Sequence, residues 1–108
     1  MNSFKIKEKR FKPRKALTGL LPGPIVTSDD ERVSCKPVDI SENGLGILSE
    51  HQLTTGEVLF LKLQDAKIEL TISYQKKDFG KHNLFRYGLT TSENTNLEEL
   101  FTKAGCLK

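Results

Sequence analysis

Apolar side chains in this chain fall into short runs that alternate with polar positions. The clearest run spans residues 67–74, where every second residue is apolar: Ile68, Leu70, Ile72 and Tyr74. A period of two residues is typical of a β-strand with one face toward the core and the other toward solvent. The pattern therefore predicts a strand over 67–74 whose buried face includes Tyr74.

Five other segments have the composition of strands and are bounded by turn residues. They span 25–28, 32–40, 45–48, 57–63 and 84–90. In the last of them Phe85, Tyr87 and Leu89 occupy every second position, and core packing explains this spacing better than an exposed aromatic platform. Short strands at intervals of about ten residues predict a mainly β fold, an antiparallel sandwich or barrel.

The first strand follows a stretch that is unusually rich in proline and glycine. The apolar residues of 17–28 are interrupted by Gly19, Pro22, Gly23 and Pro24. A central strand seldom accommodates proline, because proline cannot donate to the hydrogen-bond ladder. We therefore expect an interrupted edge strand here, most regular over 25–28.

The C-terminal segment has a helical period instead. One stripe is formed by Leu97, Leu100, Phe101 and Ala104. Asn96 precedes it as a suitable N-cap, with Glu99 at the capping-box position, and Gly105 can end the helix. The pattern predicts a short amphipathic helix over 96–104 that packs its stripe on the barrel.

Length and composition indicate one small globular domain. The chain has 108 residues, about a third of them apolar, and no apolar run approaches the roughly 20 residues that span a bilayer. No secretory signal is present, so we expect a cytoplasmic protein without membrane insertion. Cys35 and Cys106 lack metal-ligand spacing, as do the isolated His51 and His82, so we expect reduced thiols and no metal or cofactor.

Positive charge is concentrated at the N-terminus. Residues 1–15 hold seven basic side chains and one acidic one, a net charge of +6, whereas the remainder holds ten basic and thirteen acidic groups, a net charge of −3. We therefore divide the chain into a flexible basic arm, 1–16, and a barrel domain, 17–108. Such an arm suits an anionic partner, although a solvated tail would have the same composition.

Two short motifs lie within this plan. Arg10 and Arg14 stand four residues apart on the arm, and Asp39, Ser41 and Gly44 lie where one predicted strand ends and the next begins. Read by themselves, the arginines could be ordinary tail charges, and the second motif could be an Asx-type turn with a glycine corner.

At these residues the sequence resembles the PilZ domain family. That family combines RxxxR on an N-terminal arm with [D/N]xSxxG at a later strand turn, and Arg10, Arg14, Asp39, Ser41 and Gly44 fill every signature position. The late strand containing Tyr87-Gly88-Leu89 and the final helix also look like the family. The resemblance implies a six-stranded antiparallel PilZ-type β-barrel that binds cyclic di-GMP without chemical turnover.

The implied ligand suits the side chains of the two motifs. Arginine guanidinium groups fork onto phosphate oxygens and onto guanine O6 and N7, and they stack on base faces. The Asp39 carboxylate can accept from guanine N1–H and N2–H₂, Ser41 can donate to a phosphate, and Gly44 permits close backbone approach. In the family, the position held here by Lys9 is linked to binding of one ligand or a stacked pair, and both remain open.

The sequence favours a cyclic di-GMP receptor that passes its signal to a downstream protein partner. An enzyme is not expected, because Ser41 has no base arranged beside it and no paired carboxylates or phosphate-binding glycine loop occurs. A small barrel that binds single-stranded nucleic acid is an alternative, against which the acidic body argues. A protein-interaction adaptor that no longer needs the ligand is another.

Overall fold

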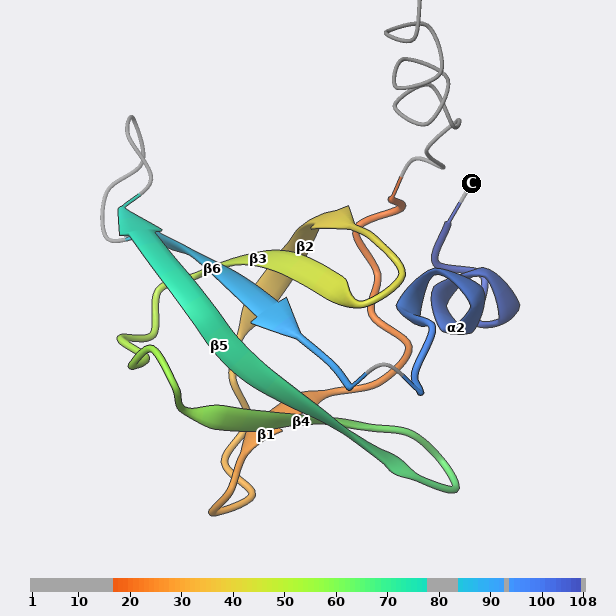
Figure 1. The fold of residues 1–108 in the computed structure, drawn as a ribbon, viewed down its shortest axis with the longest axis horizontal. Coiled ribbons are helices and arrows are strands. Elements are labelled where there is room, and N and C mark those ends of the chain that lie inside the picture. Colours follow the sequence, from red (N-terminus) through yellow and green to blue (C-terminus); the bar gives the residue numbers. More distant parts are fainter. Residues whose placement is uncertain (1–16, 78–83, 93, 108) are drawn as a thin grey trace, which may run out of the picture.

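The computed structural model describes residues 17–77, 84–92 and 94–107 of the chain. Within these ranges the elements are β1 (Ile25–Thr27), β2 (Cys35–Ile40), β3 (Gly44–Ser49), β4 (Val58–Lys62), β5 (Lys67–Lys77), β6 (Phe85–Thr90) and the helix α2 (Leu97–Lys103), all shown in Figure 1.

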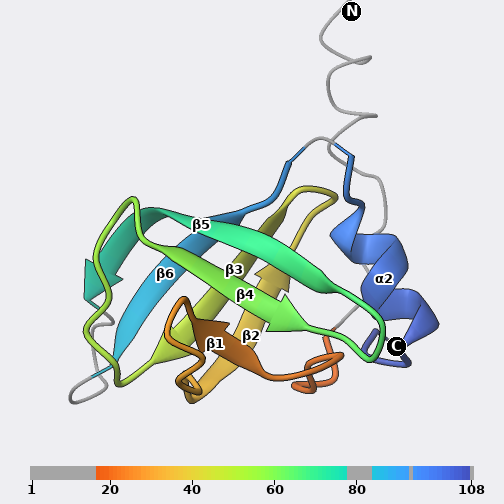
Figure 2. The same cartoon turned by 90° about the horizontal axis from the view of Figure 1, so that it is seen from below.

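The strands of the described ranges form one antiparallel sheet that curls around a core. Their order is β1-β4-β5-β6-β3-β2, so β1 and β2 are the two edges. The edges approach each other where the Val33 N–H donates to the Ile25 carbonyl oxygen at 2.8 Å. Figure 2 shows the strands wrapped around a common interior, with α2 at one end. The predicted six-stranded antiparallel barrel with a C-terminal helix is confirmed in this curled form.

Most strands lie close to the segments that the sequence pattern predicts. β1 is a three-residue edge strand, as the proline and glycine residues before it indicate. β5 is longer than predicted, because it continues past Tyr74 to Lys77. β5, β6 and β3 are consecutive in the strand order and form the centre of the sheet together with β4.

The interior of the sheet is filled by aliphatic side chains and one tyrosine. The fully buried residues include Ile47, Leu59, Leu70, Tyr87 and Leu89. The Tyr87 hydroxyl donates to the His51 carbonyl oxygen at 2.6 Å and accepts from the Leu53 N–H at 2.8 Å. Its one polar group is therefore satisfied inside the core, as a buried hydroxyl requires. The prediction that Tyr87 belongs to the core is confirmed.

The helix α2 closes one end of the barrel. Leu97 and Phe101 are fully buried against the core. The Asn96 side chain accepts from the Glu99 N–H at 3.0 Å, which caps the N-terminus. Gly105 follows the helix with a φ of +75°, the left-handed conformation common just past helix ends. The predicted N-cap and stop are thus confirmed, and Leu97 and Phe101 are buried as the stripe predicts, whereas Ala104 is the exposed C-cap residue and does not belong to the buried stripe.

Two β-bulges shift the strand register. One lies between Ile72 and Tyr74 in β5, and the other between Pro37 and Asp39 in β2. Because a bulge adds a residue to one strand, it changes the face on which the following side chains lie. Tyr74 is consequently 42% exposed. The prediction that Tyr74 shares the core face with Ile72 is wrong for this reason.

Candidate functional site

The second predicted motif lies at the junction of β2 and β3. Asp39 is the penultimate residue of β2, Ser41 begins the turn, and Gly44 is the first residue of β3. The structure thus brings these three residues together at one corner of the sheet. Lys9, Arg10 and Arg14 lie outside the described residues, so their position relative to this corner stays a prediction.

The turn is tight because its two ends are hydrogen-bonded. The Ser41 N–H donates to the Gly44 carbonyl oxygen at 2.9 Å. A Cβ on Gly44 would lie 3.0 Å from the Ser41 hydroxyl oxygen, closer than most real Cβ contacts. Glycine at this position therefore lets the Ser41 hydroxyl lie against the backbone where β3 begins.

The turn is also attached to the segment that leads into α2. The Asn43 side-chain amide donates to the carbonyl oxygens of Ser92, at 3.2 Å, and Thr95, at 2.8 Å. The Glu42 carbonyl oxygen accepts from the Leu97 N–H at 2.7 Å. The sequence motif did not single out Asn43, and only the fold brings it beside residues some 50 positions later. We assign it a positioning role for the turn.

Asp39 points over the outer face of the sheet. It lies opposite Gly46 of β3, and a Cβ on Gly46 would come within 2.6 Å of the Asp39 carboxylate. The carboxylate forms an ion pair and hydrogen bond with the Arg86 guanidinium of β6. Both side chains remain 41% exposed. A ligand approaching this face would therefore meet a carboxylate and a guanidinium side by side.

The Arg86 guanidinium interacts with the Asp39 carboxylate and with Tyr74. Its hydrogen bond to Asp39 raises the pKa of the guanidinium above its ordinary value, and partial burial opposes this. The Asp39 charge and the Tyr74 hydroxyl raise the pKa further, so Tyr74 lies near the guanidinium as well. Arg86 is thus a permanent cation between Asp39 and Tyr74.

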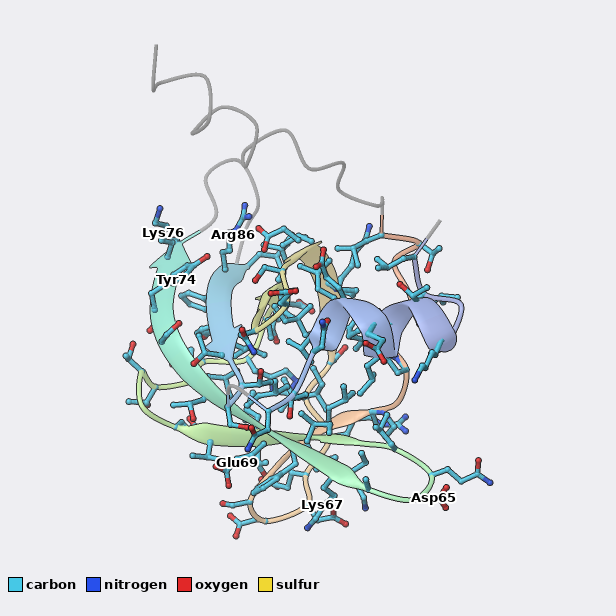
Figure 3. The ribbon with its side chains drawn as sticks, turned by 45° about the vertical axis from the view of Figure 1, so that its right-hand side comes forward. Asp65, Lys67, Glu69, Tyr74, Lys76 and Arg86 are labelled. Atoms are coloured by element: carbon cyan, nitrogen blue, oxygen red, sulfur yellow. The ribbon has the colours of Figure 1, made fainter. Side chains whose placement is uncertain are left out.

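Tyr74 completes this surface from β5. Its ring lies directly over Gly88 of β6, in the space that a side chain at Gly88 would need. Lys76 places its ammonium 6.0 Å from the centre of the ring. Figure 3 shows Tyr74, Lys76 and Arg86 at the same end of the sheet, away from Asp65 and Lys67.

Sequence reasoning missed Tyr74 and Arg86, but a signal for them was present. Gly46 and Gly88 both fall inside predicted strands, where glycine is unfavourable and often marks a bulge or a close approach of another group. The two glycines are directly paired across β3 and β6. They form the floor on which the side chains of Asp39 and Tyr74 lie.

This geometry can be compared with known proteins. The sequence profile of the PilZ domain matches residues 8–100, most of the chain. The chain belongs to the PilZ domain family. PilZ domains form a family of cyclic di-GMP receptors, which are binding or adaptor domains and not enzymes. No curated protein and no solved structure matches the chain in the same comparisons.

Among the described residues, no group of three or more His, Cys, Asp and Glu side chains is placed to hold a metal ion. The same part of the chain contains no helix with the length and apolar character to cross a membrane. Burial raises the pKa of the Cys35 thiol to about 11, so this thiol is protonated at neutral pH and a poor nucleophile.

A separate hollow of about 460 Å³ lies near the start of β5 and the end of β6. Its walls include Thr71, Thr90, Thr91 and Ser92, together with the opposite charges of Lys67 and Glu69. Of the signature residues that the structure describes, none lines this hollow. The corner at Asp39 and Ser41 is therefore the better candidate for a charged ligand.

Proposed function

We propose that this PilZ domain is a cyclic di-GMP receptor whose site joins the N-terminal arm to the β2–β3 corner. Lys9, Arg10 and Arg14 would supply the arm's contacts, and Asp39, Ser41 and Gly44 those of the barrel. The proposal is supported by the complete set of signature residues in a chain that the family profile matches. The observation that carries it is the exposed Asp39 carboxylate beside the tight Ser41–Gly44 turn.

Each residue type suits one part of the ligand. Arg10 and Arg14 would fork onto phosphate oxygens or stack on a base. The Asp39 carboxylate would accept from the N–H groups of a guanine, and Ser41 would donate to a phosphate. Because Gly44 has no side chain, the ligand could approach the backbone at the turn.

We further propose that the arm closes over the bound ligand and that a protein partner reads the resulting surface. The positive charge of the arm favours this, since two phosphates would neutralise part of it. Much of the attraction would be electrostatic, so affinity should fall as the salt concentration rises.

A calorimetric titration tests the ligand assignment. Cyclic di-GMP should bind the full chain saturably, whereas GTP and a single-stranded oligonucleotide should bind weakly or not at all. Strong oligonucleotide binding without cyclic di-GMP binding would favour the nucleic-acid alternative. Phe85 and Tyr87 cannot form the aromatic platform for that alternative, because Tyr87 is fully buried and Phe85 packs against the core.

A further inference from the structure

The outer face of the sheet contains an ordered row of four residues. Asp39 pairs with Gly46, Gly46 pairs with Gly88, and Gly88 pairs with Tyr74. The row therefore crosses β2, β3, β6 and β5, with a side chain at each end and two glycines between them. The Asp39 side chain lies over Gly46 and the Tyr74 ring over Gly88, beside the proposed ligand corner.

Both ends of the row are aimed by a β-bulge. Without the bulge before Tyr74, the alternation that buries Ile72 would also bury Tyr74. The bulge before Asp39 lies at the same level of the sheet, two strands away from β6. Bulges interrupt the hydrogen-bond ladder and are common where a side chain is re-aimed at a functional site. Two of them at one row of the sheet place both Asp39 and Tyr74 on its outer face.

Tyr74 presents an aromatic surface that the fold leaves uncovered. It is 42% exposed, whereas the other tyrosine, Tyr87, is fully buried. One face of the ring covers Gly88, and the Lys76 ammonium lies 6.0 Å from the ring centre. An exposed cation–π contact contributes about 0.5–1 kcal/mol. Stacking of a nucleobase on an aromatic ring contributes about 1–3 kcal/mol, so a base would gain more from this ring than the ammonium does.

We propose that Tyr74 is the stacking platform for one guanine of the ligand, with Arg86 and Asp39 reading the edge of that base. The inference rests on the proposed function and extends it to residues outside the two sequence motifs. The paired Arg86 and Asp39 match adjacent edges of guanine, because O6 and N7 accept from arginine while N1–H and N2–H₂ donate to a carboxylate. Adenine would present an acceptor at N1 to Asp39 and a donor at N6, so it is disfavoured.

The alternative role for Tyr74 is structural, namely to cover Gly88. Two substitutions separate the roles. Tyr74→Phe keeps the ring, and cyclic di-GMP affinity should stay within about twofold of wild type. Tyr74→Leu covers Gly88 without an aromatic face, and affinity should fall about five- to hundredfold, the equivalent of one lost stacking contact. Phe60→Leu is the matched control, because Phe60 also lies under a lysine, Lys67 at 5.0 Å, but on β4 away from the row.

Intrinsic fluorescence gives a second readout that a structural role would not change. The chain contains two tyrosines and no tryptophan. Tyr87 is buried and hydrogen-bonded, so it serves as a constant background. Cyclic di-GMP should quench part of the wild-type emission, and Tyr74→Phe should lose that ligand-dependent part while still binding. Equal quenching in wild type and Tyr74→Phe would overturn the inference.

The reading of the base edge is tested with Arg86→Lys, which keeps the charge and removes the planar fork. Cyclic di-GMP affinity should fall about tenfold, and the preference over cyclic di-AMP should narrow. Unchanged affinity and preference would exclude Arg86 from the site. If Tyr74→Leu binds as wild type does, the platform is wrong and the receptor assignment stands. If wild type itself does not bind cyclic di-GMP, the receptor assignment fails first.

Discussion

Asp39 is paired with Arg86, and its carboxylate can still accept hydrogen bonds from a ligand. Its ion pair with Arg86 is two-fifths exposed on both sides. Exposed ion pairs contribute about 0–1 kcal/mol, because water screens the charges. A ligand that replaced or shared the contact would therefore lose little, whereas a charge-assisted hydrogen bond to the ligand contributes about 1.5–3 kcal/mol. Comparison of these two free energies indicates that the Asp39 carboxylate can exchange Arg86 for a ligand at little cost.

Replacing the charged contacts one at a time should weaken ligand binding without unfolding the domain. Asp39→Ala and Arg14→Ala should each reduce cyclic di-GMP affinity roughly ten- to hundredfold, in line with one lost charge-assisted contact. The Asp39 side chain is 41% exposed and its ion pair is screened by water, so circular dichroism and the melting temperature of Asp39→Ala should stay close to wild type. Unchanged affinity in both variants, with native spectra, would exclude the proposed site.

Cys35 predicts a loss of stability at alkaline pH. Burial raises the pKa of its thiol from 9.0 to about 11 in the folded chain. Below pH 9 the thiol is neutral in both states, but as the pH rises from 9 to 11 only the unfolded state gains from ionising. Urea unfolding should therefore show wild type losing up to about 2 kcal/mol relative to Cys35→Ala between pH 8 and pH 10.5. A constant difference between the two proteins would contradict this.

At the scale of elements, the β2–β3 turn and the entry to α2 behave as one unit. The turn supplies the Glu42 carbonyl and the Asn43 amide, and the segment before the helix supplies their partners. Without these contacts, the turn at 41–44 would have fewer constraints on its conformation in the absence of ligand. Its attachment to a helix that is anchored in the core by Phe101 keeps Ser41 in place.

Removing the Asn43 amide should weaken the attachment of the β2–β3 turn to the segment before α2. Asn43→Ala eliminates two side-chain hydrogen bonds and should lower the free energy of unfolding by about 1–2 kcal/mol. Glu42→Ala is the control, because Glu42 acts through its backbone carbonyl and the substitution retains it. Chemical denaturation of both variants measures the difference. An equal loss in the two would show that the amide contacts do not hold the turn.

The sequence predicts elements more reliably than it predicts the faces of strands. Alternation located β5 and β6, and the Asn96 cap and Gly105 stop located α2. Alternation failed at Tyr74, because a bulge has no sequence period and depends on pairing with β6. Arg86 was invisible for a similar reason, since its partner Asp39 is 47 residues away. Gly46 and Gly88, which lie within predicted strands, were the only sequence signal for the row from Asp39 to Tyr74 on the outer face.

At the scale of the whole molecule, charge is divided between two parts of the chain. The first fifteen residues have a net charge of +6, and the rest has −3. The exposed outer row contains Asp39, but also Arg86 and Lys76, so the row itself is not acidic. A dianionic ligand would attract cations from both parts and reduce their mutual repulsion at once. Closure of the arm is thus a consequence that we expect from ligand charge.

Limited digestion with trypsin tests that closure on the intact chain. Trypsin can cleave after Arg10 and Arg14, whereas Pro13 protects the bond after Lys12. If the arm orders over the ligand, saturating cyclic di-GMP should slow cleavage at both arginines several-fold, because a protease needs an accessible, extended segment. Asp39→Ala retains both arm sites and should show no protection at a concentration that saturates wild type. Equal cleavage rates with and without ligand, in wild type that demonstrably binds, would rule out arm closure and leave the receptor assignment intact.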